Sequence, residues 1–219
     1  GIVHWKSLEG AEELFLLATQ QRRDVVFDGT MAWKPFVDQT IAMLRDPEYW
    51  YTRGPGYSNG DNKSELYWVR SKRREIPVQP YQIEVVGVSA DASVAVERAI
   101  VRSIVTGRSV PVRDQLESHR RFSTYFELYV GQVDAAYLFD MSASDDVPCA
   151  ADNGTPSRGL IASKPGVLFP DIRAKQTFGC LAIENIEAFS RFLKKKDINV
   201  NACSADELFA SETSSLSSG

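Results

Sequence analysis

The spacing of apolar residues divides the chain into amphipathic helices and short apolar runs. Apolar positions that recur at helical spacing predict helices over 7–22, 35–46, 92–106, 112–130 and 184–196. Short apolar runs predict strands over 24–28, 66–69, 81–89, 135–139 and 159–163. Strands and helices therefore alternate along much of the chain, which indicates an α/β fold.

Capping and turn residues support several of these boundaries. Ser7 and Asp91 are placed to cap the helices that follow them, and Pro35 lies near the first turn of its helix. The sequence Gly107-Arg108-Ser109-Val110-Pro111 breaks the helical pattern. In the first helix we expect an apolar stripe made of Leu8, Ala11, Leu14, Phe15 and Ala18. In the last helix we expect Ile186, Phe189 and Leu193 to point inward. Lys194, Lys195 and Lys196 lie at its C-terminal end, where positive charge interacts favourably with the helix dipole.

The run from Asp24 to Thr30 reads as a buried strand that ends in Asp28, Gly29 and Thr30. In parallel α/β sheets, ligands lie beyond the carboxyl ends of the strands, so these residues are candidates for chemistry. Asp28 could hold Mg²⁺ through water, and Thr30 could contact a substrate. Alternatively, Asp28 caps a turn at Gly29 and Thr30 caps the following helix.

Residues 47–80 differ in character, with several glycines and prolines and a basic run over 70–74. Gly54–Gly60 has the wrong spacing for a phosphate-binding loop, and a plain loop is the better interpretation. The segment is rich in aromatic rings that could stack on bases or simply pack on the surface, namely Tyr49, Trp50, Tyr51, Tyr57, Tyr67 and Trp68.

Composition changes this picture little. With 219 residues and 43% hydrophobic content, the chain suits one domain with a real core. A net charge of −4 and a pI of about 5.3 give no general attraction to nucleic acid or to anionic membranes. Because there is no signal-peptide pattern and no apolar run approaching roughly 20 residues, we expect a cytoplasmic protein.

Cysteine and histidine offer little support for metal or nucleophile chemistry. Cys149, Cys180 and Cys203 lie far apart without a CxxC pair, so we expect reduced thiols and no zinc site. The two histidines are His4 and His119, and we expect His119 to pack on its helix rather than act as a base.

Four arginines are better candidates for a functional site than the cysteines and histidines. Arg98, Arg102, Arg108 and Arg113 follow a helix, its exit and the start of the next helix. Guanidinium groups match phosphate oxygens and stabilise the charge of a transferring phosphoryl group, so the four could form a lid over a phosphate. A solvated helix face is the alternative interpretation.

Three short motifs, taken in order along the chain, point to a family. They are Phe27-Asp28-Gly29-Thr30-Met31-Ala32-Trp33, the strand end Val85-Val86-Gly87-Val88, and the stretch from Gly107 through His119-Arg120-Arg121-Phe122. Over about residues 7–165 this order resembles the zeta-toxin-like P-loop kinases, and most closely their plant branch, which includes the catalytic domain of calmodulin-dependent NAD kinase. The resemblance implies a three-layer P-loop fold with a mostly parallel sheet flanked by helices. The domain would cover 1–200, with an insertion at 47–80 and a loop at 142–157, before a tail at 201–219 that is disordered at its end.

The resemblance also implies an activity, namely transfer of the γ-phosphate of ATP, with Mg²⁺, to a hydroxyl of a nucleotide-type acceptor such as NAD or a nucleotide sugar. Arg102 and Arg108 resemble the catalytic lid arginines of the family, although Arg98 remains an alternative to Arg102, and Arg98 and Arg113 would add contacts to the ATP phosphates. Asp28, Gly29 and Thr30 match the acidic-Gly-Thr motif near the acceptor.

The chain departs from the family in one respect: it contains no match to the phosphate-binding pattern G-x-x-x-x-G-K-[ST]. We therefore expect a fragment, incomplete at its N-terminus, with weak or no kinase activity by itself. A different class of function also stays open, namely a non-catalytic, regulatory relative that binds a nucleotide or a partner. Calmodulin or nucleic acid binding through 189–196 or 70–74 is a weaker hypothesis, because basic helix ends and loops are common on solvated surfaces.

Overall fold

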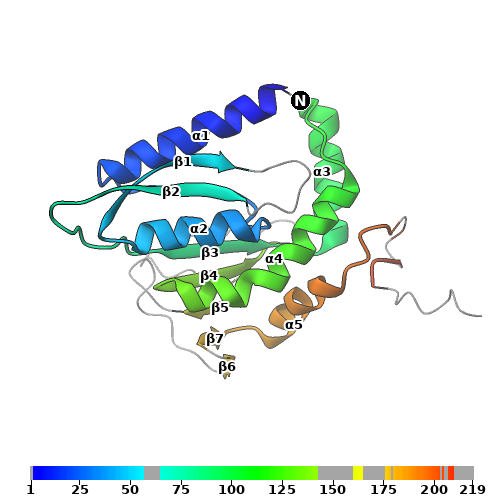
Figure 1. Cartoon of the computed structure of the whole chain (residues 1–219). Coiled ribbons are helices and arrows are strands. Elements are labelled where there is room, and N and C mark those ends of the chain that lie inside the picture. Colours follow the sequence, from blue (N-terminus) through cyan, green and yellow to red (C-terminus); the bar gives the residue numbers. More distant parts are fainter. Residues whose placement is uncertain are drawn as a thin grey trace, which may run out of the picture. The chain divides into compact units, whose positions relative to one another are not determined.

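The computed structural model describes residues 2–56, 65–142, 160–164, 176–178, 180–202, 204 and 207–209. The chain forms two compact units, Gly1–Gln82 and Ile83–Gly219. Each unit has its own sheet, two-stranded in the first and five-stranded in the second (Figure 1).

The first unit consists of two helices and a β-hairpin. Its elements are α1 (Ile2–Gln20), α2 (Lys34–Arg45), β1 (Tyr49–Gly56) and β2 (Leu66–Arg73). Helix α1 packs along β1 and α2 along β2 (Figure 1). Phe15, Met43, Tyr67 and Trp68 form the core between them.

The hairpin corrects the expectation of an irregular excursion over 47–80, in which only 66–69 was to be a strand. Strands β1 and β2 pair antiparallel and cover much of this segment. Gly54 makes the pairing possible, because a Cβ at this position would lie 2.3 Å from the backbone oxygen of Leu66. The glycine that read as a loop former is therefore a point of close backbone approach inside a sheet.

The predicted strand over 24–28 is wrong. Residues 23–28 belong to no strand or helix, and Val26 is 98% exposed rather than buried. Phe27 is half-exposed and touches the core through its ring, whose centroid lies 5.4 Å from that of Phe15 and 5.6 Å from that of Phe36. An apolar sequence forms a strand only where a neighbouring strand accepts its backbone hydrogen bonds, and no described residue does so here.

The first helix also differs from its prediction. It begins before Ser7, which therefore lies inside the helix and cannot cap it. Phe15 is buried as expected, whereas Leu8, Ala11 and Leu14 are exposed. The buried side of α1 includes Glu12, whose carboxylate accepts a hydrogen bond of 2.6 Å from Arg53 in the hairpin. A charged pair across the two elements thus replaces part of the expected apolar stripe.

The second unit contains a five-stranded sheet with the order β3-β4-β5-β7-β6. Its strands are β3 (Glu84–Ser89), β4 (Ala135–Asp140), β5 (Leu160–Lys164), β6 (Gln176–Phe178) and β7 (Leu181–Ile183). Its helices are α3 (Ala92–Thr106), α4 (Val112–Gln132) and α5 (Ile186–Lys194), followed by a 3₁₀ turn over Lys195–Asp197. The two long helices end and begin where the sequence predicts, and Gly107 takes the left-handed conformation at φ 69° that closes α3.

The sheet corrects the expectation of a mostly parallel arrangement. Among the strands that the structure describes in this unit, only β3 and β4 pair in parallel, through the crossover of α3 and α4, and the other neighbouring strands are antiparallel. Strands β6 and β7 are joined by two residues, a connection that permits an antiparallel pair only. The apolar run over 159–163, which the sequence suggests as an edge strand, forms β5 and is not at an edge, because β5 pairs with β4 on one side and with β7 on the other.

The core of this unit lies between the sheet and α4 and α5. Phe126 is fully buried, with its ring 5.5 Å from Phe122 and 5.4 Å from Phe192 of α5. Gly87 of β3 makes room for them, because a Cβ there would lie 2.9 Å from the Phe122 ring. Leu208 packs with Leu116, so the core continues past residue 200. The loop predicted at 142–157 lies mostly outside the described residues, as does the end of the tail.

Candidate functional site

The predicted acceptor residues Asp28, Gly29 and Thr30 lie in the first unit, in the exposed connection between α1 and α2. Thr30 accepts a long hydrogen bond of 3.4 Å from the backbone N–H of Ala32, so it forms a turn before α2 rather than capping the helix. In the part of the chain that the structure describes, the Asp28 carboxylate has no hydrogen-bond or ion-pair partner. It is therefore accessible, although it does not end a strand.

The four predicted arginines lie in the second unit and all are exposed. Arg98 and Arg102 belong to α3, Arg108 to the turn after it and Arg113 to the first turn of α4. Arg98 donates a 2.8 Å hydrogen bond to the carbonyl of Met141, just after β4. The guanidinium groups of Arg102, Arg108 and Arg113 have no ion pair with any described residue, so their charge remains available to an anion.

The turn that carries Arg108 is held in one conformation. Gly107 donates its N–H to the Ser103 carbonyl at 2.9 Å, and Arg108 donates its backbone N–H to the Thr106 hydroxyl at 3.3 Å. Gln115 then donates its side-chain amide to the Val110 carbonyl at 2.8 Å. These contacts fix the backbone on both sides of Arg108 and leave its side chain in solvent.

A polar cluster around the buried Ser89 and Lys195 lies at the carboxyl ends of β3 and β4. We call it the strand-end cluster; it comprises Ser89, Asp91, Asp140, Ser142, Arg191 and Lys195. Lys195 is 4% exposed and donates 2.6 Å to the Ser89 hydroxyl, with a further hydrogen bond to the Ala90 carbonyl. Arg191 donates to Asp140 at 2.8 Å, and Ser142 accepts from the Asp91 backbone N–H at 2.8 Å.

Burial and neighbouring charges shift the pKa values of this region. Burial lowers the pKa of Lys195 to about 8, although Asp91 and Asp140 act in the opposite direction. The pKa of Asp140 is lowered: burial alone would raise it, but hydrogen bonds from Ser142 and Arg191 outweigh that effect. Burial and the charge of Lys195 lower the pKa of His119 to about 4. His119 is therefore neutral at pH 7, in keeping with a packed rather than a catalytic side chain.

The shifted histidine predicts a loss of stability in mild acid. The unfolded chain protonates this histidine near pH 6.5, whereas the folded protein does so near pH 4, so the unfolded state binds more protons between these values. His119 should therefore cost about 2–3 kcal/mol of folding free energy as the pH falls from 6.5 to 4. Urea unfolding of the wild type and His119→Gln at several pH values measures this, and equal pH dependence of the two would contradict it.

The sequence predicts that Lys195 interacts with the dipole of the preceding helix, but the side chain is buried. Phe189, Phe192 and Lys195 recur every three residues along α5 and the start of the 3₁₀ turn, so they lie on the same side of this segment, and all three side chains are buried. Phe192 takes the inward place expected for Ile186, which is exposed. The spacing of three residues between Phe189, Phe192 and Lys195 is the sequence pattern that could have indicated the burial of this lysine. The carboxyl end of β3, where α/β proteins bind ligands, is consequently filled by the protein's own amine.

Residues that would hold a metal are less evident. In the described residues no group of three or more His, Cys, Asp or Glu is placed to hold a metal ion. Mg²⁺ in phosphate-transferring sites needs only one or two carboxylates beside phosphate oxygens, so the exposed Asp28 is compatible with the weak role predicted for it. The exposed arginines suit the phosphates of ATP by charge and geometry.

The hypotheses of calmodulin or nucleic acid binding through local basic runs gain no support from the described residues. The apolar face of α5 is buried, because Phe189 and Phe192 lie in the core. In the run 70–74, Arg70 pairs with Asp46 at 2.9 Å and Arg73 with Glu48 at 3.0 Å. The aromatic rings of the hairpin are also engaged within the protein: Tyr67 and Trp68 are buried, and Tyr57 lies outside the described residues. Of the cysteines, Cys180 is described, and it is exposed with a free thiol.

None of the helices that the structure describes combines the length and apolar character needed to cross a membrane.

Comparison with known proteins gives one informative relative. The chain is 38% identical over 174 residues to a calmodulin calcium-dependent NAD kinase of Arabidopsis thaliana. The match covers 75% of this chain but 31% of the relative, so the chain spans about a third of that protein's length. No family model matches the chain, and no solved structure is similar to it. The expected relationship to an NAD kinase is thereby confirmed: three quarters of this chain is similar in sequence to part of one.

Proposed function

We propose that the protein to which this chain belongs is an ATP-dependent kinase that transfers the γ-phosphate to a hydroxyl of NAD or a closely related nucleotide. The observation that carries the proposal is the 38% identity over 174 residues to an NAD kinase. Identity of this level over most of the chain is sufficient for a shared fold and favours a related reaction. The exposed Arg102, Arg108 and Arg113, which have no ion pair with any described residue, are the kind of group that such a reaction needs.

Arg102 and Arg108 are the residues that we propose to contact the ATP phosphates during transfer. Bound ATP with Mg²⁺ supplies the phosphoryl group and part of the neutralising charge. Arg108 lies on a turn whose backbone is fixed, and its guanidinium makes no ion pair with any described residue. It can therefore donate to phosphate oxygens without first losing an ion-pair partner. Arg98 and Arg113, on the neighbouring turns of α3 and α4, would add contacts to the same phosphates.

Asp28, Gly29 and Thr30 are the proposed acceptor-side residues. Asp28 is exposed and unpartnered among the described residues, so its carboxylate can orient a water bound to Mg²⁺ or accept from a hydroxyl of the acceptor. The proposal includes the P-loop kinase fold of the zeta-toxin-like family. It assigns the activity to the whole protein, because the 219 residues contain no match to the phosphate-loop pattern on which that fold relies.

The test is an assay of the complete gene product with ATP, Mg²⁺ and NAD, in which the formation of NADP is measured. The proposal expects NADP to form, and calcium with calmodulin is added in a parallel assay because the relative's name includes that dependence. Phosphorylation of a different nucleotide would reassign the acceptor. Binding of ATP and NAD without any transfer would overturn the kinase assignment in favour of a regulatory, non-catalytic relative.

A further inference from the structure

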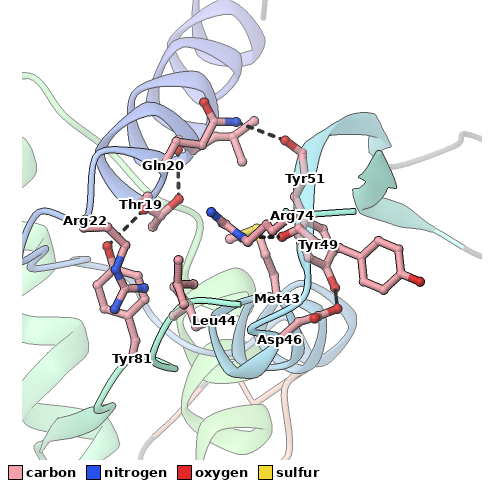
Figure 2. Close-up of a pocket in the computed structure, with 12 residues that line it drawn as sticks. Thr19, Gln20, Arg22, Met43, Leu44, Asp46, Tyr49, Tyr51, Arg74 and Tyr81 are labelled. Atoms are coloured by element: carbon pink, nitrogen blue, oxygen red, sulfur yellow. Dashed lines mark hydrogen bonds between the residues drawn. The ribbon is translucent and has the colours of Figure 1, made fainter. Parts of the chain in front are cut away.

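The first unit contains a hollow that the proposed roles of Asp28 and the lid arginines do not use. It is shallow, opens to solvent and lies between the end of α1, the end of α2 and the hairpin (Figure 2). Its charged lining residues are Arg22, Asp46 and Arg74; its other residues include Thr19, Gln20, Tyr49, Tyr51 and Tyr81. We call it the α1–hairpin hollow.

Two guanidinium groups in this hollow lack a carboxylate partner. In the part of the chain that the structure describes, neither Arg22 nor Arg74 makes an ion pair. Arg22 donates to the Gln79 carbonyl at 2.7 Å, and Arg74 donates to the Tyr49 carbonyl at 3.1 Å. A guanidinium has five N–H donors, so most of the donors on both side chains remain for another acceptor.

The one acidic residue of the hollow is already neutralised. Asp46 accepts from the Tyr51 hydroxyl at 2.7 Å and from Arg70 at 2.9 Å, and its other oxygen accepts the Glu48 backbone N–H at 2.9 Å. Arg70 is not a lining residue, so it balances Asp46 from outside. The hollow therefore keeps an excess of positive charge from its two arginines.

Both guanidinium groups are held in place by aromatic rings. The Arg22 guanidinium lies 4.2 Å from the centre of the Tyr81 ring, and that of Arg74 lies 3.8 Å from the centre of the Trp50 ring. The Tyr81 hydroxyl is in turn anchored on the Thr19 carbonyl at 3.1 Å. Side chains that are already ordered lose little conformational entropy when a ligand binds.

The two arginines also act on each other. The pKa of Arg74 is lowered, first by burial and next by the positive charge of Arg22, although Asp46 and Tyr81 act in the opposite direction. Two cations close together without an anion between them repel each other. A bound anion would reduce this repulsion and would accept hydrogen bonds from the N–H groups that have no acceptor.

We propose that the α1–hairpin hollow binds a phosphate group of a nucleotide through Arg22 and Arg74. Its openness suits one anionic group at the end of a larger molecule rather than an enclosed ligand. The proposal deepens the function proposed above, since it gives a phosphate of the nucleotide acceptor a place in the first unit. It does not depend on catalysis and can be tested by binding alone.

The test is calorimetric titration of the 219-residue chain, without Mg²⁺, using AMP, inorganic phosphate and adenosine as probes. We expect AMP to bind and adenosine to bind far more weakly. Arg22→Gln and Arg74→Gln should each weaken AMP binding by about tenfold to a hundredfold, because each removes charge-assisted hydrogen bonds to phosphate. The matched control is Arg73→Gln, which makes the same charge change on an exposed neighbour outside the hollow.

Two further variants separate this site from the lid arginines. In Arg102→Gln/Arg108→Gln we expect AMP binding to persist, so a loss there would move the phosphate site to the second unit and overturn the proposal. Arg74→Lys keeps the charge and should bind more tightly than Arg74→Gln, which distinguishes lost recognition from a damaged hairpin. Equal effects of Arg73→Gln and Arg74→Gln, binding of inorganic phosphate but not AMP, or no binding at millimolar AMP would each overturn it. NADP formation by the complete protein despite such a result would leave the kinase assignment intact.

Discussion

Replacement of Arg108 by alanine in the complete gene product should lower kcat for NADP formation by about a thousandfold, the scale on which a single arginine stabilises a phosphoryl-transfer transition state. The side chain is exposed and unpaired among the described residues, whereas its backbone is fixed by the left-handed Gly107 and the Thr106 hydroxyl. The substitution therefore removes charge without loosening the fold. KM for NAD should change little, because the arginine acts on the transferred phosphate.

The control for this experiment is Arg120→Ala. Arg120 is an arginine of α4 whose guanidinium pairs with Glu117 at 2.7 Å, and it belongs to none of the proposed sites. It should leave kcat within about twofold. The same comparison for Arg98→Ala and Arg102→Ala decides which of the two acts with Arg108. If Arg108→Ala loses no more activity than Arg120→Ala, Arg108 has no catalytic role.

Replacement of Phe126 by alanine should destabilise the second unit by about 3–5 kcal/mol. Its ring is 0% exposed and meets Phe122 and Phe192 in edge-to-face contacts, so it joins α4 to α5. The residual cavity would border Gly87, which has no side chain that could move into it. Urea unfolding monitored by circular dichroism and by amide exchange in α4 measures the loss.

Leu128→Ala is the matched control, since Leu128 lies on the same helix and is 51% exposed. Leu128→Ala should lower the free energy of unfolding by less than about 1 kcal/mol. The chain has two compact units, so amide exchange in α1 and α2 serves as an internal reference for the first unit. Equal destabilisation by Phe126→Ala and Leu128→Ala would show that the aromatic cluster does not hold this unit together.

The elements that the sequence predicts well are those whose boundaries have a local cause. The αL glycine at 107 and Pro111 separate α3 from α4 within one residue of the expected break, and the apolar alternation over 84–89 forms β3. Asp91 stands at the N-cap of α3 as expected, although its side chain makes no capping hydrogen bond. It contributes instead to the strand-end cluster, where Arg191 lies 3.7 Å away.

The elements that the sequence misses depend on partners far along the chain. The apolar character of residues 25–27 is the same whether or not a neighbouring strand exists, so it could not decide their conformation. Gly54 and the basic residues of β2 read as loop signals, because nothing local reveals that Gly54 faces the backbone of Leu66. The chemical type of the side chains is sufficient to select the candidate residues from the sequence. Their exposure, the fixed turn at Arg108 and the arginines of the α1–hairpin hollow that lack an ion pair are evident only from the structure.

The reversal of strand direction after β4 limits how a ligand can be shared within the second unit. Because β5 runs antiparallel to β4, Leu160 lies beside Phe139 while Lys164 lies at the opposite end of the sheet, bonded to the carbonyls of Val130 and Val133. Among the described strands β3, β4 and β7 therefore share one direction, with β5 running against them between β4 and β7. Strand β7 leads into α5, which brings Arg191 and Lys195 to the carboxyl ends of β3 and β4. A substitution of Arg191 or Lys195 would therefore change the chemistry of this edge, and it would also leave Asp140 of β4 or Ser89 of β3 without its present partner.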